Sequence, residues 1–222
     1  MVKILTDLKV VFNDAKIVFW DFDGVIKDSV DVKTQAFMEL FDIHGSNVVQ
    51  KVVTHHLKNG GISRFEKIPL YLESFAGQKL NDNIIAIYLE KLSNMVEQKV
   101  IDSPWVPGVL NVIKNKKFNQ IFILVTGTPH DEIRIIIETL KINRYFDIIY
   151  GSPSKKETIV KQCLGSSAVS GIDCLYFGDS YTDFSAAKTN GVPFVYVNSS
   201  NDMDKRIIPT YMVHNFKEFI DD

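Results

Sequence analysis

Two aspartates stand one residue apart, directly after an apolar run near the N-terminus. The run Ile17–Trp20 is rich in β-branched and aromatic residues, as buried strands are, and Asp21, Asp23 and Gly24 follow it. The carboxyl end of a buried parallel strand faces the crevice where α/β sheets bind ligands. Two carboxylates placed there repel each other and lose hydration unless a cation or a reaction uses them. We therefore predict a metal-dependent active site in which one aspartate does covalent chemistry.

Two later segments place groups that could bind an anion after further apolar runs. One run ends in Thr126, Gly127 and Thr128, where a hydroxyl and backbone N–H groups beside a helix N-terminus would bind an anion. The alternative is an ordinary strand-to-helix turn with a capping hydroxyl. Lys155 and Lys156 follow another short apolar run, and either could reach a phosphate or neutralise crowded carboxylates. Taken alone the lysines are a weak signal, because lysines in surface loops are usually solvated.

A fourth segment repeats the pattern of the first. An apolar run ends in Gly178 and Asp179, and Asp183 follows one helical turn later. Asp183 could belong to the same site, or it could be only a favourable charge at a helix N-terminus. Carboxylates at this density, with few histidines, select a hard cation, so we predict Mg²⁺.

The elements that must position these groups alternate between strand and helix. Short apolar runs predict strands at residues 16–20, 121–125, 148–150, 174–177 and 193–197, and a last one at 211–213. Helical spacing of apolar residues occurs between them, at 131–140, 157–164 and 183–189. This alternation predicts an α/β fold with a doubly wound, Rossmann-like parallel sheet covered on both faces.

One long segment, residues 30–103, contains no clear strand. Amphipathic spacing predicts helices at 34–41, 63–75 and 83–96. We therefore expect residues 1–29 and 104–222 to form an α/β catalytic core, and residues 30–103 to form an all-helical cap inserted after the first pair of aspartates.

The bulk properties exclude several classes of protein. The 222-residue chain has a formal net charge of −2, which favours neither nucleic acid nor an anionic membrane as a partner. Its two cysteines lack a metal-binding or disulfide pattern, which fits a reducing, cytoplasmic setting. We also expect neither a signal peptide nor a membrane span, since no apolar stretch has the required length.

Together these motifs resemble those of the haloacid dehalogenase superfamily, in its phosphatase and phosphomutase branch. The segment from Asp21 to Gly24 resembles the first motif, D-x-D-G, and Thr126 the second. Lys155 or Lys156 resembles the third-motif lysine, and loop length and helix phase favour Lys156. The segment that begins at Gly178 resembles the fourth motif, G-D-x-x-x-D. The helical segment resembles the cap of this family, so the resemblance covers nearly the whole chain.

The resemblance implies a role for each aspartate of the first motif. Asp21 would attack the phosphorus of a phosphomonoester, form an aspartyl-phosphate and bind Mg²⁺. Asp23 would bind the metal through its backbone carbonyl, while its side chain protonates the leaving oxygen and later activates water. This acid–base role requires a proton on Asp23 in the first step, so we expect nearby carboxylates to raise its pKa.

The remaining motif residues would bind the metal and the phosphoryl group. Asp179 would be a second carboxylate ligand, and Asp183 would bind the metal through water or orient the lysine. The hydroxyl of Thr126 and the N–H groups of Gly127 and Thr128 would hold the phosphoryl oxygens. The substrate expected from the resemblance is a small phosphorylated metabolite, such as a sugar phosphate or phosphoglycolate.

A glycine-rich loop in the predicted cap carries a further candidate. Residues 57–67 contain two glycines, then Ser63 and Arg64, and Arg64 could bind an anionic or hydroxyl-bearing part of the substrate. The alternative is a helix–helix turn with a capping serine.

Lys33 stands where sugar phosphomutases of the family tend to carry a histidine, which favours a phosphatase over a phosphomutase. A non-catalytic binding module is a third hypothesis, and the complete acidic set argues against it.

Overall fold

A six-stranded parallel sheet forms the centre of the molecule. The computed structural model describes residues 5–117, 119–198 and 204–219. The strands are β1 (Ile17–Trp20), β2 (Ile121–Pro129), β3 (Ile148–Ser152), β4 (Cys174–Gly178), β5 (Phe194–Val197) and β6 (Tyr211–Val213). Their order is β3-β2-β1-β4-β5-β6, and every neighbouring pair is parallel. The predicted α/β parallel sheet is confirmed.

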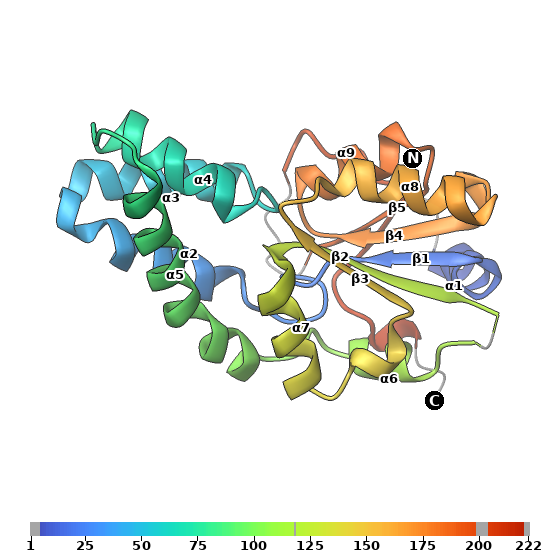
Figure 1. Ribbon diagram of the computed structural model, residues 1–222. Helices are drawn as coiled ribbons and strands as arrows, with labels where there is room; N and C mark the ends of the chain where they lie inside the picture. Colours follow the sequence, from blue (N-terminus) through green and yellow to red (C-terminus); the bar gives the residue numbers. More distant parts are fainter. Residues whose placement is uncertain (1–4, 118, 199–203, 220–222) are drawn as a thin grey trace.

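Helices cover both faces of this sheet (Figure 1). They are α1 (Leu5–Asp14), α6 (Val109–Lys114), α7 (His130–Thr139), α8 (Lys156–Ser167) and α9 (Tyr181–Thr189). Side chains alternate along each strand, so Val18 and Trp20 pack on the face with α1, α6 and α7. Ile17 and Phe19 point to the opposite face, where α8 and α9 lie. Burial on both faces explains why β1 reads as a continuous apolar run.

The segment between β1 and α6 is helical and lies beyond the carboxyl ends of the strands (Figure 1). It comprises α2 (Val30–Phe41), α3 (Ser46–Lys58), α4 (Arg64–Leu70), a π-helical turn at Tyr71–Phe75 and α5 (Asp82–Asp102). The inserted helical cap is therefore present, and the three helices expected in it are confirmed. Helix α3 was not predicted, because its valines have low intrinsic helix propensity; it packs against α2 in the structure.

Short 3₁₀ turns complete the fold, at Asp42–His44, Asn143–Tyr145, Gly171–Asp173 and Lys217–Phe219. Within the described ranges, no helix combines the length and the apolar character needed to cross a membrane.

Candidate active site

The carboxyl ends of β1 and β4 bring three aspartates and a lysine together. Asp21 follows β1 and is 3% exposed, and its backbone N–H donates to the carbonyl of Phe177 in β4 at 2.9 Å. Lys156, at the start of α8, donates to Asp21 Oδ1 at 2.8 Å and to Asp183 Oδ1 at 2.7 Å. Lys155 is exposed on the same turn, so the structure places Lys156, and not Lys155, beside the carboxylates.

The three carboxylates form a compact acidic cluster. One oxygen from each of Asp21, Asp179 and Asp183 lies within 4.8 Å of the others. Burial and the charge of Asp183 raise the pKa of Asp21 to about 7. Burial and the charges of Asp21 and Asp183 raise the pKa of Asp179 well above its ordinary value. Although burial alone disfavours the ammonium, Asp183 and Asp21 raise the pKa of Lys156 above its usual range.

The charge balance of this cluster fits a divalent cation. Lys156 is the single cation bonded to it in the described part of the chain, so three ionised carboxylates leave an excess of two negative charges. Carboxylate oxygens are the ligands that Mg²⁺ prefers, and this cluster offers three, two of them buried and that of Asp179 partly buried. The residues present therefore fit the predicted metal.

Asp183 has two sets of partners. Its Oδ2 accepts from the backbone N–H of Ser180 at 3.2 Å, which caps α9. Its Oδ1 accepts from Lys156 and from the hydroxyl of Tyr176 at 2.8 Å. The two hypotheses for Asp183, helix charge and site residue, are thus compatible, because the carboxylate that caps α9 also contacts Lys156 in the acidic cluster.

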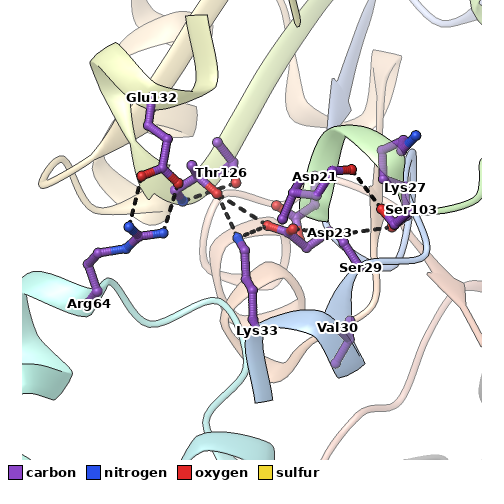
Figure 2. A network of polar contacts seen from close by, with 12 residues as sticks. Asp21, Asp23, Lys27, Ser29, Val30, Lys33, Arg64, Ser103, Thr126 and Glu132 are labelled. Atoms are coloured by element: carbon purple, nitrogen blue, oxygen red, sulfur yellow. Dashed lines mark hydrogen bonds and ion pairs between the residues drawn. The ribbon is translucent and has the colours of Figure 1, made fainter. Parts of the chain in front are cut away.

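Asp23 is bonded to Lys33 of α2 (Figure 2). It accepts from Ser29 Oγ at 2.6 Å, from Thr128 Oγ1 at 3.2 Å and from Lys33 Nζ, which also donates to Thr128 Oγ1 at 2.8 Å. Burial by itself raises the pKa of this carboxyl, but the Lys33 ammonium and the hydrogen bonds outweigh burial and lower the pKa of Asp23. The predicted rise was wrong, because the motif alone did not show that Lys33 turns back from α2 onto Asp23.

The end of β2 meets the glycine-rich loop of the cap. The buried hydroxyl of Thr126 accepts from the backbone N–H of Thr128 at 3.2 Å. A Cβ on Gly127 would lie 2.6 Å from the carbonyl oxygen of Gly61, so only glycine permits this approach. Gly61 has a φ of +76°, and a Cβ there would lie 1.9 Å from the Thr182 hydroxyl oxygen. The predicted phosphate loop and the cap loop are therefore in direct backbone contact.

Arg64 is the first residue of α4, which Ser63 caps by accepting from the backbone N–H of Phe65. Its guanidinium makes a bidentate ion pair with Glu132 of α7, with both distances 2.8 Å, and also donates to Ser93 at 2.8 Å. Arg64 and Glu132 face each other across the boundary between the cap and the sheet layer (Figure 2). Arg64 thus joins the two parts here, and its expected contact with substrate stays a prediction.

A cavity of about 80 Å³ lies between the cap and the strand ends. The sheet layer contributes Asp21, Asp23, Gly127 and Asp179 to its wall. The cap contributes polar side chains from α2, α3 and α4, which are Lys33, His56, Arg64 and Lys67. Lys67 and His56 were not singled out as site residues from the sequence. Lys67 follows Arg64 by three positions on one helix, and that spacing was the available signal.

Comparisons with known proteins match the chain to a family model, a curated relative and solved structures. The family model for haloacid dehalogenase-like hydrolases matches residues 18–197. Phosphoglycolate phosphatase 1 of Pseudomonas aeruginosa is 23% identical over 218 residues, covering 92% of this chain and 78% of that protein. A haloacid dehalogenase-like hydrolase from Bacteroides fragilis superposes with a TM-score of 0.73 at 16% identity, over 93% of this chain and 100% of that one. β-Phosphoglucomutase from Clostridium difficile gives a TM-score of 0.73 at 18% identity, over 92% of each chain. At these identities, the structural likeness shows the shared fold.

Proposed function

Since the chain belongs to the haloacid dehalogenase-like hydrolases, we propose that it is a Mg²⁺-dependent phosphatase acting on a small phosphomonoester. The observation that carries the proposal is the compact, largely buried cluster of Asp21, Asp179 and Asp183, to which Lys156 is bonded, at the sheet edge facing the cap. The similarity to a phosphoglycolate phosphatase supports the phosphatase assignment and suggests a small phosphorylated metabolite as substrate.

Asp21 is the proposed nucleophile. Lys156 holds its Oδ1, and we assign the attack on phosphorus to its other oxygen. The bond from phosphorus to the leaving oxygen breaks as the aspartyl-phosphate forms. The N–H groups of Gly127 and Thr128 and the Thr126 hydroxyl would hold the phosphoryl oxygens.

Asp21, Asp179 and Asp183 would hold Mg²⁺, with the backbone carbonyl of Asp23 as a further ligand. When bound, Mg²⁺ would offset the repulsion between the phosphate and the carboxylates and stabilise charge on the transferring group. Lys156 contributes one positive charge to the same cluster and keeps two of its carboxylates in place.

Asp23 is the proposed general acid and base. Its carboxyl gives a proton to the leaving oxygen, and its carboxylate then takes a proton from the water that attacks phosphorus and frees Asp21. Lys33 favours the ionised form of Asp23, which the second step needs. The first step needs the protonated form, and an incoming phosphate dianion would raise the pKa of Asp23 by repulsion.

Phosphate release from p-nitrophenyl phosphate tests the proposal. With Mg²⁺ we expect turnover that stops on chelation and falls at least about 1,000-fold in Asp21→Asn, as expected when a covalent nucleophile is lost. Asp28→Asn, at an exposed aspartate close in sequence, is the matched control. Full activity in Asp21→Asn would refute the nucleophile. Isomerisation of a sugar phosphate with little free phosphate would identify a phosphomutase instead.

A further inference from the structure

One cation in the wall of the cavity has no carboxylate partner among the residues that the structure describes. Lys67 is 2% exposed, and its Nζ lies 3.1 Å from Nδ1 of His56, which is 8% exposed. None of the ion pairs formed by the described residues includes Lys67. The other cationic side chains of the same wall are paired, Lys33 with Asp23 and Arg64 with Glu132.

His56 acts as a neutral acceptor for Lys67. Burial and the nearby Lys67 lower the pKa of His56 to about 2, so its ring carries no charge. Its Nδ1 accepts one of the three N–H groups of Lys67, and the ring lies against Phe37 with centroids 4.6 Å apart. The Phe37 ring centroid is also 6.0 Å from Lys67 Nζ. These contacts hold the ammonium in position but supply no negative charge.

An ammonium buried in this way is costly. Burial and the repulsion of Lys33 lower the pKa of Lys67 to about 7. A buried charge is normally paired or neutralised. An anion bound between Lys67 and Lys33 would relieve both the missing counter-charge and the repulsion between the two lysines.

The position of Lys67 indicates which part of the substrate would supply that anion. The cavity that Lys67 lines also contains Asp21 and Asp23, which lie on the sheet side, whereas Lys67 lies on the cap side. A phosphoryl group bound for attack by Asp21 would occupy the sheet side. The leaving group of the ester would then extend toward the cap, where Lys67 and His56 lie.

We propose that Lys67, positioned by His56, binds a second anionic group on the leaving portion of the substrate. The group is a carboxylate or a second phosphoryl group. This inference rests on the proposed phosphatase function, because that function sets the orientation of the substrate.

Competition against p-nitrophenyl phosphate tests the site. Two pairs of compounds differ mainly in the second anion: 3-phosphoglycerate against glycerol 3-phosphate, and fructose 1,6-bisphosphate against fructose 6-phosphate. In at least one pair, the compound with two anionic groups should have an inhibition constant for the wild type roughly tenfold lower than that of the compound with one. The pair that shows the preference identifies the carboxylate or the phosphoryl group.

Lys67→Met should abolish that preference, which is a ratio of two inhibition constants measured in the same variant and so does not depend on how fast that variant turns over p-nitrophenyl phosphate. Lys51→Met, at an exposed lysine of α3, is the matched control and should keep the preference. Lys67→Gln replaces the first variant if that protein does not fold.

Two results would overturn the proposal: no preference in either pair for the wild type, or a preference that survives in the folded Lys67 variant. Failure of the phosphatase assignment gives a different result. In that case p-nitrophenyl phosphate is not hydrolysed. Calorimetric binding of the same compounds to the wild type and the Lys67 variant still shows whether Lys67 selects the compound with two anionic groups.

Discussion

The buried ammonium of Lys67 makes the stability of the protein depend on pH in a specific way. Its pKa is about 7 in the folded protein and 10.5 without burial. Between these values the unfolded chain binds a proton that the folded chain does not, so the free energy of unfolding rises with pH. Below pH 7 both states are protonated and the full cost of burying the charge is present.

Replacing Lys67 with methionine removes this dependence. The variant should be more stable than the wild type at pH 7, because the buried charge is gone. The free energy of unfolding of the wild type rises by up to about 1.4 kcal/mol per pH unit once Lys67 is neutral in the folded state. The stability advantage of the variant should therefore shrink by about 2 kcal/mol between pH 7 and pH 9.

Urea unfolding of both proteins at pH 7, 8 and 9, without metal or phosphate, measures the effect. Lys51→Met should run parallel to the wild type, since Lys51 is exposed. A difference between the wild type and Lys67→Met that does not change with pH would refute the argument that Lys67 is a buried lysine without a counter-charge.

Further substitutions test the contacts around the cavity. Lys156→Met should lower stability by about 3–5 kcal/mol in metal-free buffer, because two buried carboxylates lose their cation, and unchanged urea unfolding would contradict this. Glu132→Gln breaks the buried ion pair with Arg64, so limited proteolysis should cut the chain at the cap boundary faster than in the wild type. Glu138→Gln, at an exposed position of the same helix, is the control. Equal cleavage rates in the two variants would contradict the role of the ion pair in holding the cap to the sheet layer. Gly61→Ala should raise KM for p-nitrophenyl phosphate at least about fivefold by displacing the cap loop. Gly45→Ala has a similar positive φ but open space around its Cβ, so it controls for backbone strain, and equal effects on KM would refute the contact argument.

The sheet was predictable because its strands are apolar on both faces. Each strand reads as a short apolar run, and four of the runs end in residues that could do chemistry, such as Asp21 and Asp179. Parallel strands place those ends at one edge, so the cluster followed from the order of the elements alone. The choice between Lys155 and Lys156 needed the phase of α8, which places Lys156 inward and Lys155 in solvent.

The environment of Asp23 was not predictable in the same way. Its pKa depends on which side chains of α2 reach it, and Lys33 lies ten residues later in the chain. The pairing of Arg64 with Glu132 joins two helices 68 positions apart, and no local pattern marks it. Lys67 follows Arg64 by three positions on one helix, but only its contact with His56 of α3 in the structure shows that it is buried with this partner.

Chemical trapping of the covalent intermediate tests the central claim most directly. Asp23→Asn should slow hydrolysis of the aspartyl-phosphate, and p-nitrophenolate needs no proton to leave, so the intermediate should accumulate during turnover with Mg²⁺. Borohydride reduces an acyl phosphate to an alcohol, and peptide mass spectrometry locates the residue that was reduced. We expect homoserine at position 21. Reduction at another residue would contradict the assignment of Asp21 as the nucleophile. So would the absence of any reduced residue in Asp23→Asn, provided that the wild type releases phosphate.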